Sequence, residues 1–373
     1  MKKIAIVGGG AAGMTAAVLL ARKGCSVTVL ERGERLGRKL SSTGNGQGNV
    51  TNINMGAEHY FSDDSQKVAR ALARFGWADT VAFLEGMGGI FLPDARGRVY
   101  PAGRQASAVT DLLRGEIARL GAEVCFGAQV KQIAYQEREK LFRVEWAGGQ
   151  MLADAVVLAA GGCAAPSFGT DGNGYALAKA FSHTVSELSP ALVQLKTDPA
   201  CVRGLKGIRV DSLVTLLRQG REVFRVRGDV LFTDGGVSGD AIFRTSSYAK
   251  KGDILQLDFL PDISSARLKG AYARGGLLCV VNNALARALE KKGDALSLVK
   301  CYPLPVTGSY GFAGAQVTKG GIPLKEVDEN LMSKLQKGLY FAGEILNVDG
   351  ECGGYNLQWA FTSAHCVAEG ICS

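Results

Sequence analysis

The residues that point most directly to chemistry form a glycine-rich turn at positions 8–13, with the sequence GGGAAG. A short β-branched run at residues 3–7 precedes the turn, and a helix-forming run at residues 14–23 follows it. A second apolar run, residues 26–30, then ends in Glu31. A strand, a glycine turn, a helix and a strand that ends in a carboxylate are the parts of a dinucleotide-binding unit.

Each part of this unit has a task in holding a dinucleotide. Gly8 permits the tight turn, Gly10 lets backbone N–H groups approach a pyrophosphate, and Gly13 lets the helix pack on the strand. Glu31 is placed to accept hydrogen bonds from both ribose hydroxyls. The simpler alternative is a glycine turn in an unrelated α/β unit. The residues expected at the cofactor here are Gly8, Gly10, Ala11, Ala12, Gly13 and Glu31.

The segment after this unit is basic and then rich in glycine and asparagine, which suits a long cofactor that lies across a sheet. Arg32, Arg38 and Lys39 are candidates to face phosphates, and a solvated basic turn is the alternative. The loop residues expected at the cofactor are Gly44, Asn45 and Gly46.

A second glycine-rich turn precedes a helix near the carboxy terminus. Apolar residues at helical spacing occupy positions 357–368, with Asn356 able to cap the helix and Gly370 able to stop it. The glycines before it let the helix N-terminus approach a ligand without intervening Cβ atoms. The residues expected there are Gly353, Gly354, Tyr355 and Asn356. A plain loop before a helix is the alternative, and packing in the core explains Trp359 and Phe361 better than ligand contact does.

The composition excludes several classes of protein. The 373 residues are 47% hydrophobic and include 50 glycines without a collagen-like period. Three histidines and nine scattered cysteines without a CxxC pair predict reduced thiols, no metal site and a cytoplasmic location. No apolar run approaches the ~20 residues that a membrane span needs. The net charge of +8 favours anionic partners without identifying one.

The GGGAAG turn, the stretch at residues 37–52 and two later motifs resemble the HI0933-like, or BaiN-like, flavoproteins. The later motifs are residues 231–241 and 345–360. The resemblance covers nearly the whole chain and implies an NAD(P)/FAD-dependent oxidoreductase, in a family that includes aminoacetone-oxidase-like proteins. The family has Arg and Cys where this chain has Gln47 and Gly48, so no charge or thiol role carries over to those positions.

By this resemblance, further segments contact FAD. Val130 would meet the adenine through its backbone, and the turn after the third strand of a meander would pass near the cofactor. Glu344 would meet the ribityl chain, and the N-terminus of the last helix would stabilise negative charge on the flavin ring. The residues implied in this way are Val130, Ala160, Gly161, Gly162, Gly343, Glu344 and Asp349.

The expected fold is α/β: a Rossmann-like FAD-binding domain of the two-dinucleotide-fold type with an inserted β-rich domain. Residues 1–188 and 309–373 would form the FAD-binding domain. The insert, residues 189–308, shows alternating strand patterns and a helical segment at about 266–292. Its Ser/Gly-rich stretch at 231–241 is expected to be a loop that caps a substrate cavity.

The expected function is hydride transfer through flavin N5, with NAD(P)H-linked reduction of an activated C=C bond in an enone, steroid or bile-acid-like substrate. Because no second complete GxGxxG unit exists, NAD(P)H would bind transiently. Tyr355 and Cys352 are candidate proton donors, with core packing and an inert thiol as alternatives. Other hypotheses are a flavin oxidase of a small amine or aminoketone, an RNA-binding flavoprotein similar to tRNA-modifying enzymes, and a flavoprotein without chemistry. A small-molecule partner is expected rather than nucleic acid or a membrane, and the oligomeric state stays open.

Overall fold

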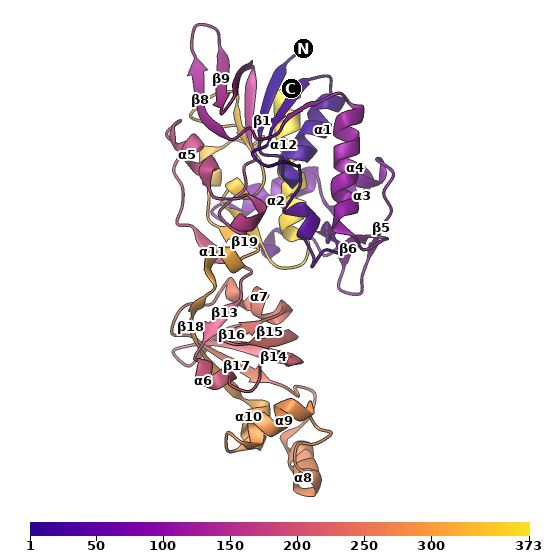
Figure 1. Ribbon diagram of the computed structural model, residues 1–373, viewed down its shortest axis with the longest axis vertical. Coiled ribbons are helices and arrows are strands. Elements are labelled where there is room, and N and C mark those ends of the chain that lie inside the picture. The colour runs from indigo at the N-terminus through magenta and orange to yellow at the C-terminus, as the bar shows by residue number, and fades with distance from the viewer. The chain divides into compact units, whose positions relative to one another are not determined.

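The computed structural model describes residues 1–373 and divides them into two compact units (Figure 1). The first unit contains residues 1–189 and 317–373, and the second contains residues 190–316. We expected these boundaries at 188/189 and 308/309. The second boundary lies later because the amides of Tyr310 and Gln316 still donate hydrogen bonds to carbonyls near the start of the insert, those of residues 194 and 192.

A five-stranded parallel sheet forms the centre of the first unit, with the strand order β20-β11-β1-β2-β7. In chain order, the strands are β1 (Lys3–Val7), β2 (Ser26–Leu30), β7 (Glu123–Cys125), β11 (Ala155–Leu158) and β20 (Leu339–Phe341). The consecutive residues Ile4, Ala5 and Ile6 are all fully buried. This pattern is typical of a central parallel strand with both faces of its sheet covered.

Two helices from opposite ends of the chain, α1 (Ala11–Arg22) and α12 (Tyr355–Cys372), pack against each other in this unit (Figure 1). Trp359 and Phe361 on α12 are at most 1% exposed, which confirms the prediction that they lie in the core. The other helices of the unit are α2 (Ser65–Arg74), α3 (Trp77–Glu85), α4 (Ala106–Arg119) and α5 (Asn173–Lys179).

Smaller sheets complete the first unit. The predicted meander is an antiparallel sheet of three strands, in the order β10-β9-β8, and β21 pairs with β4 in an antiparallel ribbon. The strands are β3 (Thr51–Asn52), β4 (Tyr60–Ser62), β5 (Phe91–Pro93), β6 (Arg98–Pro101), β8 (Val130–Gln136), β9 (Leu141–Trp146), β10 (Gly149–Ala153), β19 (Val317–Lys319) and β21 (Val348–Gly350).

The second unit is built on a closed barrel with the strand order β13-β16-β15-β14-β17-β18. Its strands are β13 (Leu195–Thr197), β14 (Arg209–Arg218), β15 (Arg221–Thr233), β16 (Gly236–Ser238), β17 (Ile254–Asp258) and β18 (Tyr302–Ser309). The short strand β12 (Ser189–Ala191) stands where the chain enters the unit.

The helices of the second unit are α6 (Pro199–Val202), α7 (Asp240–Ser246), α8 (Ser265–Gly275), α9 (Asn283–Glu290), α10 (Ala295–Lys300) and α11 (Gly311–Gly314). The helical part therefore extends to residue 300, beyond the predicted limit at residue 292. Among the twelve helices of the chain, none combines the length and apolar character that a membrane crossing requires.

Residues 231–241 are not the cavity-capping loop that we expected. They complete β15, turn at Asp234 and Gly235, form β16 and begin α7. A Cβ atom at Gly236 would overlap the carbonyl oxygen of Leu195 on the paired strand β13. Gly236 therefore serves strand packing in the barrel wall.

Gly370 does not stop the last helix, which continues to Cys372. A Cβ atom at Gly370 would lie 2.5 Å from the Cβ atom of Asn330, and the Gly370 carbonyl accepts a hydrogen bond from the Tyr340 hydroxyl at 3.1 Å. This glycine permits a close approach of two segments and does not cap the helix.

The two helical glycines Gly370 and Gly115 predict opposite effects of the same substitution. Gly115→Ala on α4 should raise the unfolding free energy by about 0.5–1 kcal/mol, because its Cβ would meet no atom within 4 Å and alanine favours the helix. Gly370→Ala should lower it, because the overlap with Asn330 outweighs that gain. Calorimetric unfolding of both variants checks this, and stabilisation by Gly370→Ala would contradict the packing described.

Candidate functional site

The carboxyl ends of β1, β11 and β20 meet at one edge of the parallel sheet, because these strands are neighbours with the same direction. A glycine-containing turn follows each strand, at residues 8–13, 159–162 and 342–344. The Ala159 amide donates to the Val7 carbonyl at 2.9 Å, and the Ala342 amide donates to the Leu158 carbonyl at 3.0 Å. Open α/β sheets bind their ligands at this edge.

The backbones of these turns approach one another so closely that side chains are excluded. Gly8 has a φ of +104°, and a Cβ atom there would lie 2.9 Å from the Cα atom of Ala160. A Cβ atom at Gly13 would overlap the carbonyl oxygen of Gly8. At the end of β20, a Cβ atom at Gly343 would lie 2.8 Å from that of Ala12 on α1. The structure thus brings together the turns that the sequence assigned to one cofactor.

The N-terminus of α1 is open to a ligand. Gly10 is the N-cap residue, no side chain caps the helix, and its first turn contains no acidic residue. A Cβ atom at Gly10 would meet no atom within 4 Å, in contrast to Gly8 and Gly13. The free N–H groups and the helix dipole favour an anion such as a phosphate at this position.

Glu31 at the end of β2 is fixed beside the glycine turn. One carboxylate oxygen accepts a hydrogen bond from the Gly9 amide at 2.8 Å, and the other accepts one from the Gly33 amide at 2.7 Å. The Glu31 carbonyl accepts from the Ala128 amide at 2.9 Å, which brings the segment before Val130 to the same place. Val130 itself is buried as the first residue of β8. A ribose bound here would donate to the same Glu31 carboxylate that already accepts hydrogen bonds from the loop amides.

Two of the three basic side chains expected to face phosphates bind a neighbouring loop. Arg32 forms an ion pair with Asp171 at 2.6 Å, and the Arg38 guanidinium donates to the Ser167 carbonyl at 2.9 Å. Gly161, with a φ of +74°, lies in the turn that leads to this loop. These contacts give both arginines a role in connecting the basic segment to residues 167–171.

Lys39 forms an ion pair with Glu344 at 2.7 Å, so these two predicted site residues bind each other. The second Glu344 oxygen accepts from the Thr318 amide at 2.9 Å. The Thr318 hydroxyl in turn accepts from the Cys163 amide at 2.7 Å, and a Cβ atom at Gly162 would overlap that hydroxyl. The sequence contained no signal for Thr318, because its importance comes from contacts with residues distant in the chain.

The turn at residues 44–46 is exposed, with φ values of 58°, 55° and 83° at Gly44, Asn45 and Gly46. The Gly46 carbonyl accepts from the Ala106 amide at the start of α4 at 2.8 Å. Asn49, which our prediction omitted, is 8% exposed, and its Oδ1 atom is buried without a hydrogen-bond partner. It stands in the asparagine-rich stretch that carried the resemblance, which was the available signal.

The N-terminus of α12 also lacks a side-chain cap and an acidic first turn. Gly353 and Gly354 have φ values of +137° and +101°, and a Cβ atom at Gly354 would overlap the backbone of Thr51. The prediction that Asn356 caps this helix is wrong, because Gly354 is the N-cap residue. The Asn356 amide side chain instead exchanges hydrogen bonds with the backbone of Gly350, at 2.7 and 2.8 Å.

Tyr355 is the first residue of α12 and is only 5% exposed. Its ring stacks on His59 with the centroids 4.5 Å apart, and its hydroxyl donates to the Asn54 carbonyl at 3.4 Å. These contacts are those of a packed side chain. Cys352, the other candidate proton donor, is partly buried in the turn before the helix.

Asp349 on β21 is 2% exposed, and its Oδ2 atom is buried without a hydrogen-bond partner. Burial raises the pKa of Asp349 to about 7, the nearby Lys319 charge opposes this rise, and Glu344 adds to it. An unpaired buried carboxyl is costly unless a ligand or a proton satisfies it. Among the predicted site residues, Asp349 therefore has the strongest requirement for a hydrogen-bond partner from a ligand.

These features fit an extended anionic dinucleotide such as FAD. Two helix N-termini without caps offer N–H donors, the open space at Gly10 gives access to the backbone, and the buried oxygens of Asn49 and Asp349 lack partners. No group of three or more His, Cys, Asp or Glu side chains within residues 1–373 is arranged to hold a metal ion.

Comparison with known proteins places this architecture in a family. The model of the HI0933-like protein Rossmann domain matches residues 2–370. A 3-dehydro-bile acid delta(4,6)-reductase from Clostridium scindens is 33% identical, over 98% of both chains. A ribosomal RNA dihydrouridine synthase from Haemophilus influenzae is 28% identical, over 98% of this chain and 97% of its own.

Solved structures show the same fold at low identity. The 3-ketosteroid-delta4-(5alpha)-dehydrogenase from Rhodococcus jostii RHA1 is similar with a TM-score of 0.56 and 16% identity, over 100% of this chain and 97% of its own. The 3-ketosteroid delta1-dehydrogenase from Sterolibacterium denitrificans gives a TM-score of 0.56 at 13% identity, over 100% of both chains. The chain belongs to the HI0933-like family of Rossmann-domain flavoproteins and is an FAD-dependent oxidoreductase.

Proposed function

We propose that the protein reduces a C=C bond conjugated to a carbonyl group, with a steroid or bile-acid-like enone as the substrate and NAD(P)H as the reductant. The observation that carries this proposal is the 33% identity, along nearly the whole chain, to a reductase of 3-dehydro bile acids. The product of the second relative, dihydrouridine, also arises by addition of two hydrogen atoms to a C=C bond next to a carbonyl. One chemistry therefore accounts for both relatives.

Residues on both sides of the sheet edge would hold FAD. The α1 N-terminus and Gly10 would bind the pyrophosphate, and Glu31 would bind the adenosine ribose. The α12 N-terminus would lie at the flavin ring, where its N–H groups favour negative charge. Bound FAD supplies a ring that accepts a hydride at N5 and passes it to a second substrate.

The acidic and basic side chains near the carboxy-terminal turns would orient the middle of the cofactor. Lys39 neutralises Glu344, so this carboxylate is held in place and can still accept a hydrogen bond from a ribityl hydroxyl. Asp349 would hold a proton near neutral pH, since burial raises its pKa to about 7. A protonated Asp349 can donate a hydrogen bond to an acceptor on the cofactor.

The binding of NAD(P)H and the source of the proton are the two steps that the known residues constrain. The chain contains no second complete GxGxxG unit, so NAD(P)H would bind transiently at the flavin and leave before the enone enters. Tyr355 is poorly suited to protonate the substrate, because its ring is buried against His59. Cys352 stays a candidate proton donor, and water is the alternative.

A second candidate substrate is a uridine base in RNA. The second unit carries 18 basic and 11 acidic side chains, so it has a net charge of +7 out of +8 for the whole chain. Six exposed basic side chains lie in its helical part, namely Arg267, Lys269, Arg274, Arg287, Lys291 and Lys292. Such a distribution favours a polyanion over a neutral steroid. It also suits the carboxylate of a bile acid.

The substrate assay separates these candidates. Anaerobic holoprotein with NADH or NADPH should remove the ultraviolet absorption of a steroid enone while one nicotinamide is oxidised for each C=C bond reduced. A saturated 3-ketosteroid serves as the control and should not react. Unmodified ribosomal RNA should yield no dihydrouridine by mass spectrometry.

Three results of this assay would overturn the proposal in different ways. Dihydrouridine formation without enone reduction would assign RNA as the substrate. If the protein consumes oxygen when a small aminoketone is added and does not reduce the enone, it is an oxidase. An enone that stays intact even after the flavin is reduced with dithionite would exclude steroid reduction.

The contacts of Glu31 predict its effect on the cofactor. Glu31→Ala should raise the Kd for FAD about 10- to 100-fold, because the proposed charged hydrogen bonds from the ribose, about 1.5–3 kcal/mol, would be lost together with those that order the loop. Glu34→Ala, an exposed acid in the same turn, is the matched control and should change the Kd less than twofold. Fluorescence titration of the apoprotein with FAD gives both values, and equal Kd values would contradict the orientation of the adenosine.

The raised pKa of Asp349 predicts how the stability of the apoprotein depends on pH. The folded state keeps a proton that the unfolded state releases near pH 4. The contribution of Asp349 to the free energy of unfolding therefore falls as the pH rises from 4 to its folded pKa of about 7. Asp349→Asn should remove this fall and make the variant more stable than the wild type at pH 8. Thermal unfolding between pH 4 and pH 8 measures the difference, and parallel curves for both proteins would contradict it.

A further inference from the structure

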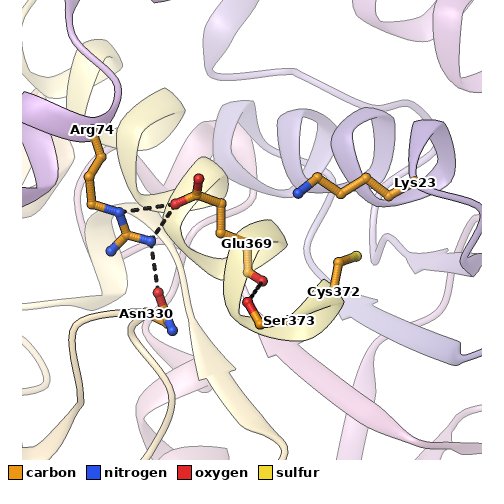
Figure 2. A pocket seen from close by; sticks show the side chains of 6 residues that line it. All are labelled: Lys23, Arg74, Asn330, Glu369, Cys372 and Ser373. Carbon is orange, nitrogen blue, oxygen red and sulfur yellow. Dashed lines mark hydrogen bonds and ion pairs between the residues drawn. The ribbon is translucent and has the colours of Figure 1, made fainter.

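The ends of α1 and α12 that point away from the glycine turns border a polar recess (Figure 2). Its lining residues are Lys23, Arg74, Asn330, Glu369, Cys372 and Ser373. Because α12 has 18 residues, this recess lies about 27 Å along the helix from its N-terminus. The proposed cofactor site therefore does not use these side chains.

Two cysteines meet beside this recess. The Sγ atoms of Cys25, just before β2, and Cys372, the last residue of α12, are 3.8 Å apart, although 347 positions separate them in the chain. A disulfide needs an S–S distance of about 2.05 Å. Cys372 is exposed in the last turn of α12, so a small movement of that turn closes this gap without breaking a strand.

We propose that Cys25 and Cys372 form an oxidisable dithiol, a modification site at which a hydroperoxide converts the two thiols into an intramolecular disulfide. The site is built from the first βαβ segment and the last helix of the same compact unit. It is independent of the proposed substrate and of the cofactor.

The surroundings assign different roles to the two thiols. Burial and the hydrogen bond to Cys372 raise the pKa of Cys25 to about 11, which keeps Cys25 protonated at neutral pH. Cys372 is the exposed partner, and it lines the recess together with Lys23 (Figure 2). The Lys2 ammonium donates to the Ile371 carbonyl and so places a second positive charge at this end of α12. Cys372 is therefore the thiol that attacks the oxidant.

The reaction is balanced in two steps. The Cys372 sulfur attacks one peroxide oxygen, the O–O bond breaks, and a sulfenic acid and one water molecule form from the thiol and hydrogen peroxide. The Cys25 sulfur then attacks the Cys372 sulfur, the S–O bond breaks, and a second water molecule leaves as the disulfide forms. The two thiols lose two protons and two electrons, and the peroxide receives them to give the two water molecules.

The test is peptide mapping of the full-length holoprotein after treatment with hydrogen peroxide and alkylation of the remaining thiols. Without reduction, trypsin should release residues 24–32 linked to residues 338–373. The second peptide also contains Cys352 and Cys366, so the assignment depends on variants. Cys372→Ser should abolish the linked peptide, and Cys301→Ser, which removes another exposed thiol, should leave it unchanged.

Trapping with dimedone tests the order of the two steps. In Cys25→Ser the sulfenic acid at Cys372 has no partner thiol, so the yield of its dimedone adduct should rise at least fivefold over the wild type. Four results would overturn the proposal. The first three are no linked peptide in the wild type, a linked peptide that persists in Cys372→Ser, and a dimedone adduct at Cys25 in Cys372→Ser. Wild type that forms only disulfide-linked dimers would also overturn it.

Discussion

Close contact between backbones at the carboxyl end of β1 is the constraint on which the rest of the first unit depends. Gly8 and Gly13 touch each other across the turn, so α1 lies on the strand with no side chain between them. This contact sets the position of the α1 N-terminus over the sheet edge. A helix raised by one methyl group would direct its free N–H groups elsewhere, and the anion site would be lost.

The same principle joins the carboxy-terminal segment to this edge. Gly343 contacts Ala12 at the start of α1, and Gly354 contacts the backbone of Thr51. Each contact brings a different element to the carboxyl edge of the sheet. The strand β20 ends beside the first turn of α1, and α12 begins beside the asparagine-rich segment. In the proposed site, two helix dipoles that arise about 340 residues apart in sequence would serve one ligand. The ion pair of Lys39 with Glu344 adds a link between the early basic segment and the late turn.

The sequence predicted most of the fold because its local signals agree with the tertiary contacts. The β1–α1–β2 unit, the meander and the burial of Trp359 follow from periodicity and glycine placement. Predictions failed where a glycine had two explanations. Gly370 was predicted to end a helix and Gly236 to lie in a loop, and both instead allow another segment to come close, which a single sequence does not reveal.

Side-chain partners were the least predictable part of the site. The sequence showed that Arg32, Arg38 and Lys39 are basic, but their partners at residues 171, 167 and 344 come from segments more than 120 positions away. Asn356 was correctly placed at the start of the helix, yet it binds the preceding turn, because the N-cap position is occupied by Gly354, which has no side chain to cap the helix. Thr318 matters through contacts that folding creates, and Asn49 matters because folding buries its Oδ1 atom without a partner.

The most direct test of this account is a crystal structure of the protein with FAD, together with the flavin-to-protein ratio. The account predicts one FAD per chain, with its phosphates at residues 10–13 and its ring at the start of α12. An FAD molecule bound with the opposite polarity, or a chain that takes up no flavin at saturating concentration, would contradict it.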